Sequence, residues 1–158
     1  MDPKRSMLRH AVATVAYRGG KALRDAPASF ATFSPDGSPR TPAKILAHLG
    51  DLFDWALSQA TGVEAWHDST PLDWDRDVAR FFDALERFDK CLASDAPLAA
   101  TPEMLFQGAI ADSLTHIGQL AMLRRLAGAK MKSENYSRAD IVAGRVGTAQ
   151  TVPRREFD

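Results

Sequence analysis

Cysteine is almost missing from this chain of 158 residues, in which Cys91 stands alone. One thiol cannot form an internal disulfide, so nothing in the sequence calls for an oxidising compartment. The chain also has a formal net charge of zero, because 20 lysines and arginines balance 20 aspartates and glutamates. A balanced chain has no general attraction to nucleic acid or to anionic membranes, and we expect neither as a partner.

Long apolar runs are also absent. No run approaches the roughly 20 residues that span a bilayer, and the first ten residues, MDPKRSMLRH, lack the apolar centre of a signal peptide. The sequence therefore predicts a cytoplasmic protein. Hydrophobic residues make up 45% and charged residues 25%, which is an ordinary globular composition, and the length fits one domain over residues 1–158.

Apolar residues recur at helical spacing in four segments, and no segment has a convincing strand pattern. The expected helices are 5–23, 42–59, 71–92 and 102–126. The dipeptide Thr-Pro opens three of them, at 41–42, 70–71 and 101–102. Threonine caps free N–H groups and proline suits the first helical position. Two prolines and a glycine exclude a continuous helix in the loop 26–40. The pattern predicts an all-α four-helix bundle.

The last thirty residues are less regular. Ser137 and Asp140 have the spacing of a capping box, which predicts a short helix over 138–144. Residues 148–158 are expected to form a tail that packs on the bundle or is partly exposed. Arg124, near the end of the fourth helix, is expected to face solvent or the acidic residues of the tail.

The fourth expected helix carries two polar residues where apolar ones dominate. His116 lies inside the apolar arc, and Asp112 lies one turn earlier at its edge. A buried imidazole or carboxylate is costly unless it is paired or bound to a metal. Residues four apart meet on one helix face, so Asp112 and His116 can share one partner.

His48 offers that partner from the second helix, between Ile45 and Leu52 near the edge of the apolar face. Bundle metal sites are built from facing helices in this way. Two imidazoles and one carboxylate suit a divalent Zn, Ni, Fe or Mn ion and leave positions open for water or substrate, which favours catalysis. The alternative is a hydrogen-bonded Asp112–His116 pair, with His48 bonded to a backbone carbonyl.

Other candidates carry weaker signals. Asp51 is the most credible additional site residue, as a hydrogen-bond partner of a ligand or as a replacement ligand. Trp66 could equally cover a cavity mouth or make a surface contact, and its neighbour His67 is expected to be solvated. Cys91 lies off the apolar stripe of the third expected helix and has no nearby base in the sequence. It is therefore not expected to be a nucleophile.

Two segments resemble the DinB/YfiT-like superfamily of metal-binding bundle proteins. Residues 45–52, Ile-Leu-Ala-His-Leu-Gly-Asp-Leu, resemble its histidine-bearing helix. Residues 116–120, His-Ile-Gly-Gln-Leu, resemble its final metal histidine and the Gly-Gln-Leu that follows it. The family's motif in this helix is H-x-x-x-H, and this chain has Asp112 at the first position. The resemblance spans roughly residues 8–128.

The resemblance implies a four-helix bundle with a DinB-like, non-simple connection order, which is often a homodimer. It implies a metal site of His48, Asp112 and His116 that opens to a cavity. Several relatives are metal-dependent transferases that join a low-molecular-weight thiol to an electrophile, or act in detoxification. Asp112 is a harder ligand than histidine, which makes Fe and Mn plausible beside Zn and Ni. Three functions stay open: an enzyme acting on a small molecule, a non-catalytic metal- or ligand-binding protein, and a structural dimer whose site has decayed.

Overall fold

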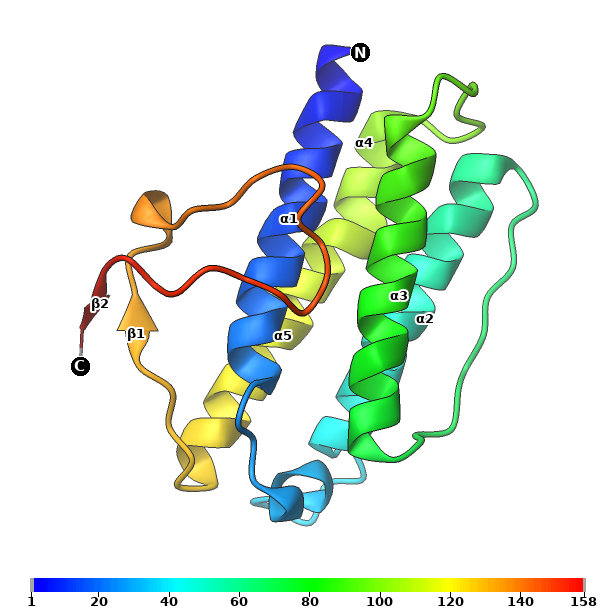
Figure 1. Ribbon diagram of the computed structural model, residues 1–158. Helices are drawn as coiled ribbons and strands as arrows, with labels where there is room; N and C mark the ends of the chain where they lie inside the picture. The colour runs from blue at the N-terminus through cyan, green and yellow to red at the C-terminus, as the bar shows by residue number, and fades with distance from the viewer. Residues whose placement is uncertain (1, 158) are drawn as a thin grey trace.

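Four long helical segments form a bundle in the computed structural model of the protein, which describes residues 2–157 (Figure 1). The elements of the bundle are α1 (Pro3–Leu23), α2 (Pro42–Thr61), α3 (Trp74–Ala93) and α4 (Pro102–Leu105), the last of which continues through a π-helical turn (Phe106–Ile110) into α5 (Ala111–Leu126). The all-α prediction is therefore confirmed. None of the helices in residues 2–157 combines the length and the apolar character that crossing a bilayer requires.

Two of the three Thr-Pro helix starts are confirmed. The Thr41 hydroxyl accepts a hydrogen bond from the Lys44 N–H at the start of α2, and the Thr101 hydroxyl accepts one from Met104 at the start of α4. Each bond satisfies one of the N–H groups that a helix leaves free at its first turn. A left-handed Gly62, with φ of 84°, ends α2.

The third Thr-Pro start is wrong, because α3 begins at Trp74 and not at Pro71. Two carboxylates hold the preceding segment extended. Asp51 on α2 accepts hydrogen bonds from the N–H and the hydroxyl of Ser69. Asp77 in the first turn of α3 accepts the Leu72 N–H at 2.8 Å. These contacts satisfy the backbone of the segment outside a helix.

The expected fourth helix is interrupted by its π-helical turn. Gly108 lies inside it with a non-helical ψ of −105°, and the buried Ser113 hydroxyl donates to the Ile110 carbonyl at 2.7 Å just beyond it. A π turn inserts one extra residue, which rotates the following helix by about 100° relative to the preceding one. Leu105 before the turn and Leu120 after it are thereby both fully buried.

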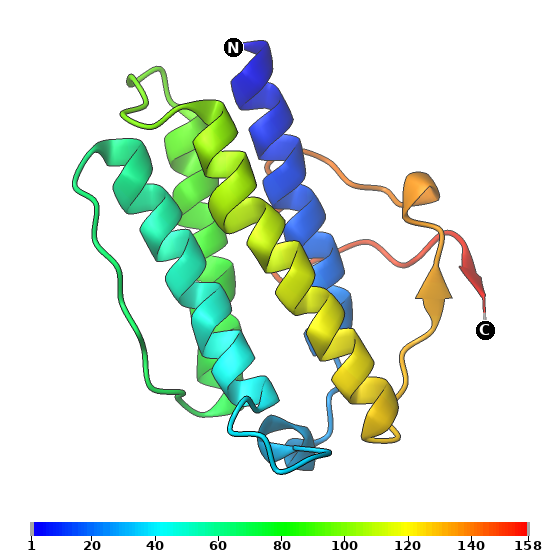
Figure 2. The same cartoon turned by 180° about the vertical axis from the view of Figure 1, so that it is seen from behind.

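The order of the helices around the bundle differs from their order in the chain. Helix α3 packs between α1 and α2, and α5 closes the bundle between the same two helices. Residues 63–73 run down the outside of the bundle from the end of α2 to the start of α3, so these neighbours point in the same direction (Figure 1). Figure 2 shows α5 and α2 side by side on the opposite face.

An apolar stripe on α3 supplies much of the core. Phe81, Leu85, Phe88 and Leu92 are all completely buried, as their spacing predicts. Burial of such side chains contributes roughly 2 kcal/mol each. The α1–α3 contact is close because Gly19 has no side chain: a Cβ there would lie 3.0 Å from the Phe81 ring.

The expected helix 138–144 is wrong. A single 3₁₀ turn, Tyr136–Arg138, is capped by Asn135, and Asp140 pairs with Arg145 and Arg154 instead of capping a helix. The Asp140 carboxylate is therefore used in ion pairs and not in the expected capping box.

Residues 148–158 were expected to pack on the bundle or to be partly exposed, and the described part of this tail does both: it contacts α1 through Glu156, and most of its residues are exposed. Strands β1 (Ser133–Glu134) and β2 (Glu156–Phe157) pair antiparallel. Lys21 of α1 binds both strands, through Glu134 at 2.8 Å and Glu156 at 2.7 Å.

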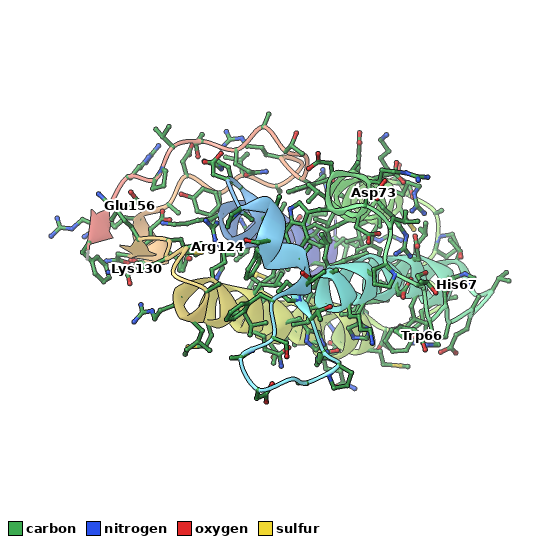
Figure 3. The ribbon with its side chains drawn as sticks, turned by 90° about the horizontal axis from the view of Figure 1, so that it is seen from below. Trp66, His67, Asp73, Arg124, Lys130 and Glu156 are labelled. Atoms are coloured by element: carbon green, nitrogen blue, oxygen red, sulfur yellow. The ribbon has the colours of Figure 1, made fainter. Side chains whose placement is uncertain are left out.

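The expectation that Arg124 faces solvent or acidic residues is wrong. Its side chain is buried, and its guanidinium donates to the carbonyls of Ala22, Arg24 and Ala129. The first two belong to the end of α1, where helix carbonyls lack internal partners. Arg124 therefore fastens α5 to the end of α1, and Figure 3 shows it between these two helices.

Candidate metal centre

His48 of α2 and the pair Asp112 and His116 of α5 converge at one point. Asp112 Oδ2 lies 3.3 Å from His116 Nε2 and 3.7 Å from His48 Nε2. One ligand atom from each of the three residues lies within 4.8 Å of the others. The π-helical turn ends directly before this segment, so it sets the rotation at which Asp112 and His116 reach α2. The structure thus brings together the three residues that the sequence singles out.

The separations fit a shared divalent ion. Ligand atoms bound to one ion at about 2.1 Å, with bond angles of about 90–110°, lie roughly 3.0–3.4 Å apart. The two Asp112 distances are close to that range, and small side-chain rotations would close the remainder. Two imidazoles and a carboxylate are a ligand set that Zn, Ni, Fe and Mn accept. The three residues could therefore hold such an ion.

The second ring nitrogen of His116 has two possible partners. Gln119 Oε1 lies 2.8 Å from Nδ1, and Arg40 Nη2 lies 3.2 Å from it. Donation from Nδ1–H to Gln119 leaves a lone pair on Nε2, the form that binds metal. Acceptance from Arg40 places the proton on Nε2, which then faces the Asp112 carboxylate. Gln119 thus supports the metal-binding tautomer, and Arg40 supports the metal-free one.

His48 lies in an aromatic corner beside the site. Its ring is 4.7 Å from the His116 ring and 5.6 Å from Trp66, centroid to centroid. Burial lowers the pKa of His48, the charges of His116 and Arg40 lower it further, and Asp112 opposes them. His48 is therefore neutral at neutral pH, which is the state a metal ligand requires.

Trp66 covers this corner from the outer segment 63–73. Its ring lies edge-on to His48 and to Trp55, 6.0 Å away, and the side chain remains 48% exposed. Figure 3 shows Trp66 and His67 together at the outer edge of the bundle beside α2. Of the two roles considered for Trp66, the structure shows the contact, with the rings of His48 and Trp55, and Trp66 lines neither of the two cavities described below.

Asp51 lies apart from the three ligands. Its carboxylate is buried and accepts hydrogen bonds from Ser69 and Arg80. Arg80 can reach it because Gly50 leaves space: a Cβ there would lie 2.8 Å from the guanidinium. Asp51 therefore anchors the outer segment to α2, one turn from His48.

The two remaining candidates lie outside the site. His67 is exposed, as expected. Burial raises the pKa of the Cys91 thiol, so little of it is in the nucleophilic thiolate form at neutral pH.

Two cavities reach the site from different sides. A cavity of about 430 Å³ is lined by His48 together with Arg40, Lys44 and Asp68. A cavity of about 450 Å³ is lined by Asp112 together with Leu52, Trp55 and Gly108. The first carries the charged groups of Arg40, Lys44 and Asp68, and the second is flanked by apolar groups. Sequence reasoning missed Arg40, because a loop residue before a helix start carries no periodic pattern.

Comparisons of the chain with protein-family models, curated proteins and solved structures found no match. The candidate site is therefore defined by its own residues and their geometry.

Proposed function

We propose that the protein is a DinB/YfiT-like metal-dependent enzyme that acts on a small molecule at His48, Asp112 and His116. A transferase that joins a low-molecular-weight thiol to an electrophile, as in detoxification, is the reaction class that best fits this site. The observation that carries the proposal is the convergence of two imidazole nitrogens and one carboxylate oxygen within 4.8 Å.

Three protein ligands favour catalysis over a structural role. A structural zinc site normally has four protein ligands, whereas a catalytic site keeps a position for water or substrate. A bound divalent ion would supply Lewis acidity, which lowers the pKa of a coordinated thiol or water. The protein holds the ligands in place, through Gln119 at His116 and through the packing of Trp66 on His48.

The two cavities provide room for two reactants. One is lined by His48 and the other by Asp112, and these residues lie 3.7 Å apart at their nearest polar atoms. A transferase needs its nucleophile and electrophile side by side, because proximity and orientation supply a large part of the rate enhancement.

Elemental mass spectrometry on untagged protein tests metal binding. We expect about one ion per chain in the wild type, and loss of that ion in His48→Ala and in His116→Ala. His67→Ala is the matched control, because it removes an exposed imidazole that lies outside the site, 19 residues along the chain from His48. No retained metal after incubation with Zn, Ni, Fe or Mn would refute the proposal and leave a hydrogen-bonded polar cluster.

Turnover is tested with the metal that this measurement identifies. The metal-loaded protein is assayed for conjugation of a low-molecular-weight thiol to a chromogenic aryl chloride, with His116→Ala as the inactive control. Metal-dependent turnover supports the transferase. Full metal loading without turnover across a panel of thiols and electrophiles favours the alternative below.

The alternative is a non-catalytic, metal- or ligand-binding homodimer. It is favoured by apolar side chains exposed where α1 meets the π-helical turn, because the exposed Met7 and Phe106 line one apolar groove there. Exposed apolar residues that cluster on one face are typical of an interface. Sedimentation velocity of the wild type and of Phe106→Glu tests it. A wild-type dimer that Phe106→Glu converts to a monomer would support the homodimer.

A further inference from the structure

We propose that Arg40 and Lys44 bind the anionic head group, a carboxylate or phosphate, of the small molecule that reaches the metal centre. The head group would occupy the cavity of about 430 Å³ that both residues line beside His48. This inference rests on the proposed function, because it names the chemical class of the ligand at that same site.

The lining of the cavity carries an excess of unpaired positive charge. Among residues 2–157, neither Arg40 nor Lys44 forms an ion pair with a carboxylate. The Asp51 carboxylate at the cavity wall is neutralised by Arg80. Asp68 is the remaining acid of the lining, so two cations face one carboxylate. A cavity with this balance attracts anions.

The backbone adds to the positive potential. Helix α2 begins at Pro42, and its first turn contains Lys44 and no acidic residue. The N-terminus of a helix carries a partial positive charge, for which aspartate or glutamate in the first turn is the usual complement. Here a lysine occupies that turn, so the positive potential at the start of α2 is reinforced and an external anion is favoured.

Metal binding changes the hydrogen bonding of Arg40. Its guanidinium can donate to His116 Nδ1 only while that nitrogen carries no proton. When Nε2 binds metal, Nδ1 holds the proton and donates to Gln119 at 2.8 Å. Arg40 then loses its acceptor on His116, and its guanidinium becomes available to the anion in the cavity.

The spacing along α2 defines the dimensions of the ligand. Lys44 and His48 are four residues apart in one helix, so their side chains are neighbours, with Cβ atoms about 6 Å apart. The ligand that fits therefore places its anionic group about one helical turn from the atom that meets the metal.

Inorganic phosphate is the probe, and isothermal titration calorimetry on the full chain is the measurement, with and without the bound metal. The variants Arg40→Gln and Lys44→Gln each remove one charge from the cavity. Arg125→Gln and Lys130→Gln are the matched controls, because both side chains are exposed and neither forms an ion pair within the described residues. Figure 3 shows Lys130 at the opposite end of the molecule from Trp66.

We expect phosphate to bind the metal-loaded wild type, with affinity about tenfold weaker in each cavity variant, the scale of one charge-assisted hydrogen bond. Both controls should match the wild type, and Asp68→Asn should strengthen binding, because it removes the opposing charge. Metal content is measured on every sample, so a failure of the metal site is seen separately from a failure of the anion site.

Three results would overturn the inference. They are no phosphate binding to a protein that holds its metal, equal binding in the cavity variants, and equal loss in the variants and the controls. The second result would mean that phosphate contacts the metal alone, and the third that it responds only to net charge. In each case measured metal binding would leave the proposed function standing.

Discussion

The imidazole rings of His48 and His116 stand almost perpendicular, at 86° with centroids 4.7 Å apart. The two rings therefore do not stack, and the Nε2 atom of each lies close to the Asp112 carboxylate. The angle follows from the origin of the two residues on neighbouring helices, α2 and α5.

We expect the carboxylate of Asp112 to set the metal preference of the proposed site. We expect Asp112→His to shift the preference toward Zn and Ni and away from Mn, because a third imidazole is a softer ligand than a carboxylate. The relative affinity for Mn over Zn should fall by at least about tenfold, which corresponds to roughly 1.4 kcal/mol. Competition titration with a chromogenic chelator measures it. An unchanged ratio would show that Asp112 does not ligate the ion, and Asp95→His, at an exposed position after the end of α3, serves as the control.

We expect the fluorescence of Trp66 to report on metal binding at the proposed site. Its ring is 5.6 Å from His48, so coordination of His48 changes the electrostatic environment of the indole. We expect metal addition to alter the emission of the wild type and to leave that of Trp66→Phe nearly unchanged. Trp74→Phe is the control, because Trp74 packs on Phe30 in a different part of the molecule. A response that survives in Trp66→Phe and disappears in Trp74→Phe would contradict this arrangement.

Because of Asp77, we expect the free energy of unfolding to vary with pH in the mildly acidic range. Burial raises its pKa, although the Leu72 N–H and Arg80 oppose the shift and Asp51 adds to it, and its Oδ1 has no partner among the described residues. Between the ordinary and the raised pKa the folded state binds more protons than the unfolded state, so this group's contribution to stability falls as pH rises.

Asp77→Asn should remove that slope while its amide oxygen still accepts the Leu72 N–H. Urea denaturation from pH 4 to pH 7 should therefore show the variant gaining on the wild type as pH rises. If the free energy of unfolding changed with pH in the same way in both proteins, that result would contradict a raised pKa for the buried Asp77 carboxyl. Asp83→Asn is the control, because Asp83 is exposed on the same helix.

Glu134 fixes the tail to α1. Its buried carboxylate accepts from the Tyr17 hydroxyl at 2.6 Å and pairs with Lys21 at 2.8 Å. Glu134→Gln removes the buried partner of Lys21 but leaves its pair with Glu156, so we expect a loss of about 2 kcal/mol, less than for a buried charge left fully unpaired. Thermal denaturation measures the loss, and limited proteolysis should cut the variant first in the tail.

The control for the tail is Glu86→Gln, which breaks an exposed pair with Lys90 on α3. Exposed pairs contribute little, so its stability should match that of the wild type. Equal losses in Glu86→Gln and Glu134→Gln would show that burial of the Glu134 network is not the cause.

Features governed by local rules could be predicted from the sequence. The caps at Thr41 and Thr101 depend on residues three positions away, and the burial of Phe81 and Leu85 follows from helical spacing. The three candidate ligands could be found in the same way, because an imidazole on an apolar face needs a partner and His48 has the matching place on another helix.

Features governed by distant partners could not be predicted. The start of α3 depends on Asp51, which binds Ser69 eighteen positions along the chain. The burial of Arg124 depends on the Ala22 carbonyl, 102 positions away. The π-helical turn around Gly108 lets both Leu105 before it and His116 after it face the other helices. The local sequence pattern does not show that both residues need this orientation.

The outer segment 63–73 connects two helices that already pack directly on each other, and it also carries Trp66 over the site. The three ligands belong to the helices, whereas the indole packed on His48 belongs to this connection. In the proposed enzyme, a change in the length or sequence of the connection would shift the surroundings of His48 while the set of three ligands stays the same. Evolution of this one segment would then diversify the molecules accepted by a conserved metal centre.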